Sequence, residues 1–246
     1  MTEKNSAYRL RTPLLLPWLL LLSLLLLPLL LLSSASRAEE HRLTFTAQEI
    51  HAWPQKSFVD YTDYTLSARQ PTQSKEEEKR SQTKDSSSKV LSAKAHGQAS
   101  ALYHETTIDL TKTPYLQWRW RVDKQPVITN ARQKNQDDYP ARIYLVIKEG
   151  IFPWQVRSLN YVWASHKPQE DFWPNPYTDR AIMIPLRDAN DAQQKWVSEK
   201  INIVADYQRI FGRRISEIHG IAIMTDTDNT GGKAHAYYDT LTFTAD

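Results

Sequence analysis

The strongest constraint on the fold is a strict alternation of apolar and polar side chains in residues 115–123. The apolar positions are Leu116, Trp118, Trp120 and Val122. Successive side chains of a β-strand point to opposite faces. This spacing therefore predicts a strand with one face in a core and the other outside. Arg119 and Arg121 belong to the outer face of that strand.

Similar patterns recur along the chain. Residues 195–211 differ, because Trp196, Ile203 and Tyr207 fall on one helical stripe that stops at Gly212, which predicts one α-helix. About nine strands with a single helix predict a mainly β protein: a β-sandwich of jelly-roll type. The further predicted strands are 61–70, 90–95, 101–110, 141–148, 159–165, 181–186, 218–224 and 234–244.

Residues 1–38 have the three parts of a secretory signal. A basic start precedes an apolar run at 14–32, and small residues at 33–38 predict cleavage after Ala38. The alternative is an uncleaved inner-membrane anchor, because the run of 19 residues is close to the roughly 20 that span a bilayer. In both cases residues 39–246 are predicted to form one exported, periplasmic domain, with membrane contact only through an uncleaved leader.

Composition excludes several classes of site. The chain has a net charge of +3, but the leader holds four basic residues and one acidic residue. The remainder is formally neutral, so charge gives no support for a nucleic-acid partner. With no cysteine, disulfides, thiol catalysis and zinc–thiolate sites are excluded. Residues 71–89 have no aromatic or aliphatic side chain and are predicted to be a flexible polar insertion.

Two charged clusters are candidate binding residues. Arg119 and Arg121 carry planar guanidinium groups, which suit carboxylates and vicinal hydroxyls. The alternative is that they are exposed arginines outside a tryptophan core. Asp137 and Asp138 precede Arg142, so their carboxylates are candidates for a cation site or for an acid with a raised pKa. The alternative there is a turn with an Asp–Arg pair at the end of a strand.

Two further clusters have both a structural and a functional interpretation. Tyr161 and Trp163 share one strand face, which is either core or a platform for stacking a sugar. Asp226, Asp228 and Asn229 follow an apolar strand and precede two glycines. This loop is either an irregular calcium site or a tight turn whose side chains bond to their own backbone.

The chain resembles a bacterial family known as domain of unknown function 3047. Five ordered blocks carry the resemblance: 118–120, 137–142, 161–163, the pairs 206–207 and 211–212, and 221–230. The resemblance covers roughly residues 58–243, with a polar insertion longer than the usual connection. It implies a galactose-binding-like jelly roll and no particular activity.

These observations favour an exported β-sandwich that binds a glycan or another cell-envelope component without turning it over. One alternative is an envelope scaffold protein. Another is a glycoside hydrolase or lyase that uses Asp137 or Asp138 with Asp226 or Asp228. No cofactor is expected beyond a structural calcium ion at Asp226 and Asp228. The candidate ligand-binding residues are Arg119, Arg121, Asp137, Asp138, Arg142, Tyr161, Trp163, Asp226, Asp228 and Asn229.

Overall fold

A computed structural model describes residues 42–69, 89–152, 155–166, 168, 170–191 and 193–246. The leader and residues 70–88 lie outside the described residues, so the predictions of a signal sequence and of a flexible insertion stay predictions. Lys89, the last residue of the polar segment, begins a strand. No helix in the described ranges has the length and apolar character needed to cross a membrane.

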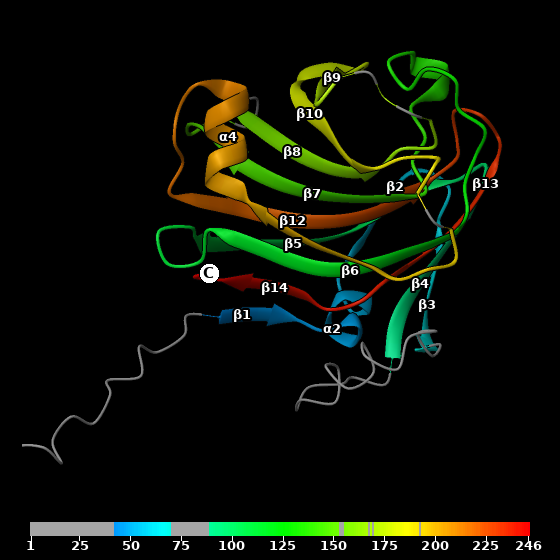
Figure 1. The fold of residues 1–246 in the computed structure, drawn as a ribbon, viewed down its shortest axis with the longest axis horizontal. Helices are drawn as coiled ribbons and strands as arrows, with labels where there is room; N and C mark the ends of the chain where they lie inside the picture. Colours follow the sequence, from blue (N-terminus) through cyan, green and yellow to red (C-terminus); the bar gives the residue numbers. More distant parts are fainter. Residues whose placement is uncertain (1–41, 70–88, 153–154, 167, 169, 192) are drawn as a thin grey trace, which may run out of the picture. The chain divides into compact units, whose positions relative to one another are not determined.

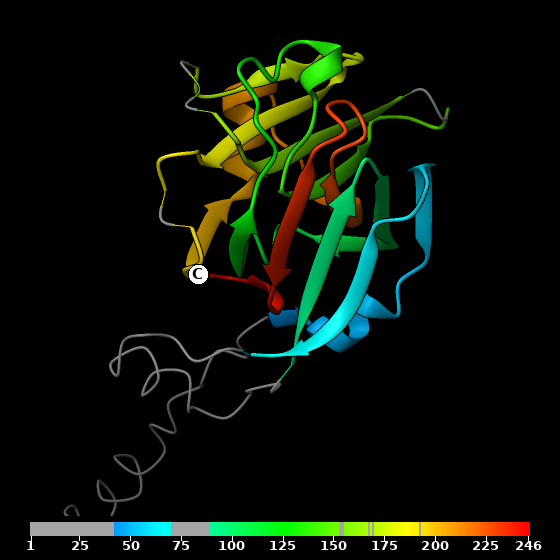
Figure 2. The same ribbon diagram turned by 90° about the vertical axis from the view of Figure 1, so that its right-hand side faces the viewer.

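The described residues form two seven-stranded sheets, which we name sheet A and sheet B (Figure 1). Sheet A has the order β1-β14-β6-β13-β4-β3, and β11 also pairs with β6. Its strands are β1 (Arg42–Phe45), β3 (Asp63–Ala68), β4 (Lys89–His96), β6 (Tyr115–Lys124), β11 (Val197–Asn202), β13 (Lys233–Tyr238) and β14 (Leu241–Thr244). Seen from the side, β13, β4 and β3 run next to one another in sheet A (Figure 2).

Sheet B has the order β2-β5-β12-β7-β8-β10-β9, and its only parallel pair is β8 with β10. Its strands are β2 (Gln55–Val59), β5 (Ala99–Asp109), β7 (Ala141–Lys148), β8 (Val156–Trp163), β9 (Trp173–Asn175), β10 (Thr178–Arg187) and β12 (Glu217–Asp226). The helices are α2 (Ala47–His51), α4 (Ile203–Phe211) and the short 3-10 helix η1 (Lys134–Gln136). The predicted β-sandwich is confirmed.

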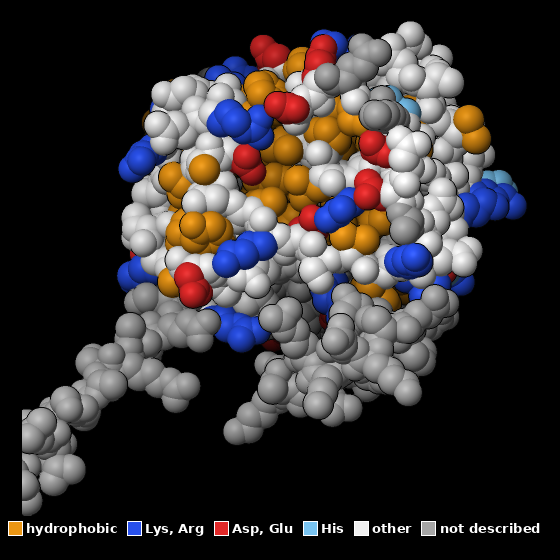
Figure 3. All heavy atoms as spheres, viewed as in Figure 1, with side chains coloured by type: hydrophobic (Ala, Val, Ile, Leu, Met, Phe, Trp, Pro, Cys, Tyr) orange, Lys and Arg blue, Asp and Glu red, His pale blue; other side chains and the backbone are white. Residues whose placement is uncertain are grey.

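The core lies between the sheets and uses the alternation seen in the sequence. The four apolar residues of β6 are at most 3% exposed, and β7 contributes Ile143, Leu145 and Ile147 from the opposite sheet. Trp120 meets Trp163 across the core, with ring centroids 5.9 Å apart. Burying a large apolar side chain contributes about 1.5–3 kcal/mol. In the space-filling view, apolar side chains gather in the middle of one face, with charges of both signs around them (Figure 3).

The predicted helix at 195–211 is wrong in its first half. Residues 197–202 form β11, which pairs antiparallel with β6, and only residues 203–211 are helical. Val197, Glu199 and Ile201 oppose the inward residues of β6, so their spacing follows a strand period. Asn202 caps the helix by accepting a hydrogen bond from the Ala205 N–H at 2.9 Å. The helix ends at Gly212, whose φ of 73° favours glycine.

Several short elements were not predicted. They are β1, α2, β2 and β9, and the predicted strand at 234–244 is divided into β13 and β14. Helix α2 begins at a capping box, in which Thr46 accepts a hydrogen bond from the Glu49 N–H and the Glu49 carboxylate accepts one from the Thr46 N–H. The division near Asp239 lets β6 pair with β14 along its first half and with β13 along its second half.

We expect Glu199→Ala to lower the free energy of unfolding by about 2–3 kcal/mol. The Glu199 carboxylate accepts hydrogen bonds from Trp120 Nε1 at 2.9 Å and from Arg187 Nε at 2.7 Å. Its removal leaves the indole N–H of a fully buried tryptophan without a partner. Urea unfolding measures the change. Glu217→Ala, at a half-exposed carboxylate, is the control and should stay within about 0.5 kcal/mol of wild type; equal losses in both variants would contradict the assignment.

Candidate functional site

The structure divides the ten candidate residues among three places. Six of them meet where β12 ends and β7 begins, and we call this group the loop-end cluster. Its members are Asp137, Asp138, Arg142, Asp226, Asp228 and Asn229. Arg119 and Arg121 lie on the outer face of sheet A, because their β6 neighbours point into the core. Tyr161 and Trp163 lie inside the sandwich. The arginines of β6 and of β7 therefore do not line one surface.

The idea that Tyr161 or Trp163 stacks on a ligand does not fit this geometry. Both side chains are 0% exposed and pack between the sheets. Tyr161 uses its hydroxyl to donate to Asp206 Oδ2 at 3.0 Å, and Trp163 packs against Trp120. A sugar ring has no access to either residue. They are core aromatics, as the structural interpretation of their spacing expects.

Arg142 is buried although it points away from the core. It shares the outer face of sheet B with Val162, its partner on β8. The segment 125–140 covers this face through a small apolar cluster that includes Ile128 and Tyr139. As a result Arg142 is only 3% exposed, and its guanidinium lies 4.5 Å from the Tyr139 ring centroid. A buried guanidinium needs a carboxylate partner.

Asp226 is that partner. Arg142 Nη2 donates to Asp226 Oδ2 in a short ion pair, and Asp226 Oδ1 accepts from the Tyr139 N–H at 3.3 Å. Arg142 Nη2 also donates to the Asp137 carbonyl at 3.3 Å. The pair therefore links the end of β12 to the start of β7 and to the segment that precedes it. Breaking a buried pair on one side leaves an uncompensated charge, which is strongly destabilising.

Asp138 holds the loop after β12. Its Oδ1 accepts from Asn229 N at 3.0 Å and Asn229 Nδ2 at 3.3 Å. Its Oδ2 accepts from Thr230 N at 2.8 Å and Thr230 Oγ1 at 2.5 Å. Four donors occupy the acceptor sites of one carboxylate. Asp138 is 0% exposed, so its role in this structure is to fasten residues 229–230 to the sandwich.

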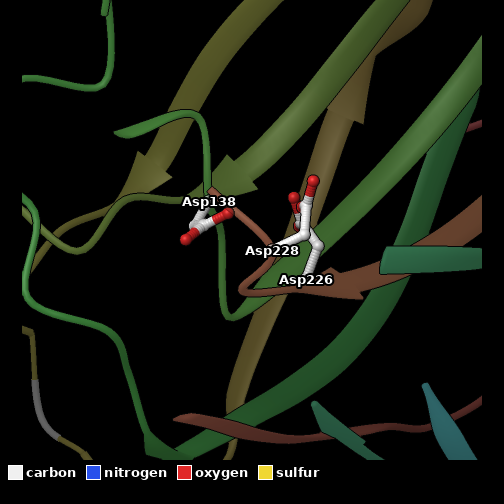
Figure 4. Close-up of side chains that lie close together, drawn as sticks. All are labelled: Asp138, Asp226 and Asp228. Carbon is white, nitrogen blue, oxygen red and sulfur yellow. The ribbon is translucent and has the colours of Figure 1, made fainter. Parts of the chain in front are cut away.

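Three carboxylates of the loop-end cluster are close enough to share a cation. One oxygen from each of Asp138, Asp226 and Asp228 lies within 4.8 Å of the others. Figure 4 shows these side chains meeting from the segment before β7 and from the end of β12 with its following loop. However, the donors on Asp138 and the guanidinium on Asp226 already occupy two of the three groups. A calcium ion at Asp226 and Asp228 stays a prediction.

Burial makes this cluster electrostatically unfavourable. It raises the pKa of Asp226 above its usual range, with Arg142 opposing the shift and Asp138 reinforcing it. Burial also raises the pKa of Asp137 and of Asp228. Asp137 is 6% exposed, and its Oδ2 accepts from Asn175 Nδ2 at 2.7 Å, while its buried Oδ1 has no partner among the described residues. Arg142 opposes the rise of the pKa at Asp226, Asp137 and Asp228, but burial outweighs it.

The exposed rim of the cluster includes a residue that the sequence did not single out. Tyr177 is 57% exposed, and its hydroxyl donates to Asn229 Oδ1 at 2.7 Å. The Lys134 ammonium lies 5.2 Å from its ring centroid. Asp228 and Asn229 are half-buried beside it. We call Tyr177, Asp228 and Asn229 the rim. No periodic or motif signal marks Tyr177, because it lies in the short connection between β9 and β10.

We expect Asp138→Asn to lower the free energy of unfolding by about 2–3 kcal/mol. The amide offers one acceptor oxygen in place of two, and its N–H₂ group faces the donors of Thr230. Chemical unfolding at neutral pH measures this loss. Asp179→Asn changes an exposed aspartate of β10 and should have almost no effect. A variant at Asp138 as stable as the Asp179 variant would show that the loop is held by other contacts.

We expect Asp137→Asn to raise the free energy of unfolding, by an amount that depends on pH. Because its pKa is raised in the folded protein, the unfolded chain loses this proton at lower pH than the folded chain. Stability therefore falls as the pH rises from the ordinary pKa of the group to the raised one. The asparagine variant lacks this loss, so its stability relative to wild type should increase from pH 4 to pH 7. Urea unfolding at both pH values tests this, and a constant difference would contradict it.

Comparison with known proteins identifies a family. Curated protein sequences gave no match. Among solved structures, the chain is similar to the Endo-D glycoside hydrolase domain of Streptococcus pneumoniae, with a TM-score of 0.39 and 9% identity. The aligned region is 79% of this chain and only 22% of that one. It is also similar to a family 11 carbohydrate-binding module of Clostridium thermocellum, with a TM-score of 0.38, 12% identity, and coverage of 82% and 94%. At these TM-scores the likeness carries no information on ligand or activity.

The model of a family described as a protein of unknown function, DUF3047, matches residues 52–242, and the chain belongs to this family.

Proposed function

We propose that this chain is an exported, non-catalytic binding protein for a glycan of the cell envelope, and that the rim contacts the glycan. The observation that carries this proposal is an exposed aromatic ring beside a carboxylate on a rigid frame. Tyr177 is 57% exposed and hydrogen-bonded to Asn229, the neighbour of Asp228. Aromatic rings stack on the apolar face of a sugar. Carboxylates accept hydrogen bonds from its hydroxyls.

The buried part of the loop-end cluster supports this role by fixing the rim in place. Asp138 holds the backbone of Asn229 and Thr230, and Arg142 holds Asp226 at the start of the same loop. The side chain of Asn229 in turn positions the Tyr177 hydroxyl. A binding group held by a second layer of hydrogen bonds loses less conformational entropy when a ligand binds. The rim therefore has the preorganisation that a weakly hydrophobic ligand such as a sugar requires.

The leader gives the proposed location. Its basic start, apolar run and small-residue end are typical of a chain exported to the periplasm. The neutral charge of the remaining residues fits a ligand recognised through hydroxyl groups rather than through overall charge. A glycan of the envelope is the hydroxyl-rich ligand that such a protein meets.

Glycoside cleavage has less support from the carboxylates. That chemistry needs an acid and a second carboxylate that both reach the scissile bond across a cleft. Asp138 is 0% exposed and Asp226 is 1% exposed, and both are engaged by protein donors. The pairs considered from the sequence each need one of the two aspartates of 137–138 and one of Asp226 or Asp228. Only Asp228 among these four is more than slightly exposed.

The test is a glycan array with the full-length chain, followed by titration of the glycan that binds. Tyr177→Ala should weaken binding by roughly 3–10-fold, because a stacked aromatic ring contributes about 0.5–1.5 kcal/mol. Asp228→Asn should weaken it by roughly tenfold through loss of charge-assisted hydrogen bonds. Calorimetry measures both affinities.

Tyr61→Ala is the matched control, because Tyr61 is 61% exposed and lies in the connection between β2 and β3. Its affinity for the glycan should equal that of wild type. Circular dichroism confirms that each variant is folded. Equal affinities for all three variants would place the ligand elsewhere, and a blank array with folded protein would rule out the proposal.

A further inference from the structure

The outer face of sheet A carries three arginines close together. Arg119 and Arg121 are outward residues of β6. Arg69 follows β3 and pairs with Asp239, and the Asp239 N–H donates to the Arg119 carbonyl at 2.9 Å. Asp239 therefore links Arg69 to the backbone of Arg119 at the point where the neighbour of β6 changes from β14 to β13.

The carboxylates of this face leave one of the three arginines without a counterion. Arg69 Nη2 lies 2.5 Å from Asp239 Oδ2. Arg121 donates to both oxygens of Asp123, from Nε at 2.5 Å and from Nη2 at 2.9 Å. Within the part of the chain that the structure describes, the side chain of Arg119 has no ion pair and no hydrogen bond, and its Nε is buried without a partner. Its guanidinium keeps a full positive charge.

Aromatic rings hold Arg119 in position. Its guanidinium lies 5.6 Å from the ring centroid of Trp196, which precedes β11 and reaches over the outside of sheet A. Trp196 packs against Tyr237 of β13, and Arg121 lies 5.4 Å from the Tyr237 ring centroid. The two rings are only 9% exposed and pack with Val90 in a small apolar cluster. The two rings therefore position the arginine side chains and do not themselves stack on a ligand.

We propose that Arg119 is the anchor of a second binding site, which takes an oxyanion of an anionic ligand, either a carboxylate or a phosphate. A half-buried guanidinium loses part of its hydration, and an ion pair with two parallel hydrogen bonds restores the lost interactions. The planar group stacked on Trp196 is already fixed in orientation, which lowers the entropic cost of bidentate binding. Arg69 and Arg121 are each neutralised by a carboxylate, so Arg119 carries the remaining positive charge of these three arginines.

This site is independent of the rim. Tyr177 lies in the β9–β10 connection of sheet B, and Asp228 and Asn229 lie in the loop that joins β12 of sheet B to β13 of sheet A, whereas Arg119 lies on the outer face of sheet A. Failure of glycan binding at Tyr177 would leave the Arg119 proposal unaffected, and the reverse also holds.

The experiment is calorimetric titration of the full-length chain with three probes. Oligogalacturonate presents carboxylates on a sugar chain, its methyl ester is the uncharged counterpart, and tripolyphosphate presents phosphate. We expect at least one charged probe to bind and the ester not to bind. Arg119→Gln should weaken the binding of the charged probe roughly tenfold or more. Arg119→Lys should give a smaller loss, because it keeps the charge but not the planar fork. Higher salt should weaken binding to the wild type.

Arg209→Gln is the control, because Arg209 lies on α4 and is already paired with Asp206. Binding of oligogalacturonate alone would identify a carboxylate ligand, and binding of tripolyphosphate alone would identify a phosphate ligand. Three outcomes would overturn the proposal: equal binding of the ester and the acid, equal losses in the Arg119 and Arg209 variants, or no binding of either charged probe.

Discussion

The buried ion pair between Arg142 and Asp226 is the interaction on which the loop-end cluster depends. It joins the second residue of β7 to the last residue of β12, and both strands lie in the middle of sheet B. The Arg142 N–H also donates to the Tyr238 hydroxyl, which reaches across from sheet A. Without a carboxylate at 226, a fully desolvated guanidinium would lie beneath the 125–140 segment. This pairing fixes the start of the loop after β12, and the hydrogen bonds of Asp138 fix the residues that follow.

The carboxylates around this pair exceed what folding needs. Asp226 neutralises Arg142 and Asp138 fastens the loop, but Asp137 has a buried oxygen without a donor and a raised pKa. Asparagine has the same shape and would remove that cost. Residues that break a rule of stability without a local compensation are expected at functional sites. The position of Asp137 directly behind the exposed Tyr177 and Asp228 therefore supports a binding role for this end of the sandwich more strongly than it supports a purely structural one.

Local patterns in the sequence predict the strands and their inward faces, because burial between two sheets imposes a period of two. Trp118 and Trp120 are core for that reason, and so are Tyr161 and Trp163. Pairing between distant strands is not encoded locally. The alternation places Arg119 and Arg142 on the outer faces of their strands, but it does not show that the two strands belong to different sheets. The same limit explains the error at 195–211: Val197 and Ile201 fit a helical stripe nearly as well as a strand, and only pairing with β6 selects the strand.

The separation of the two arginine positions has a consequence for ligand binding. The charge of Arg142 is paired with that of Asp226, whereas Arg119 has no carboxylate partner in the described residues. The buried guanidinium of Arg142 thus has a structural role. The half-buried guanidinium of Arg119 is the one without a paired charge in the described residues. A hydroxyl-rich ligand at the rim and an oxyanion on sheet A make no shared contact. An anionic glycan that reached both proposed sites would bind more tightly than either site alone allows, through effective concentration.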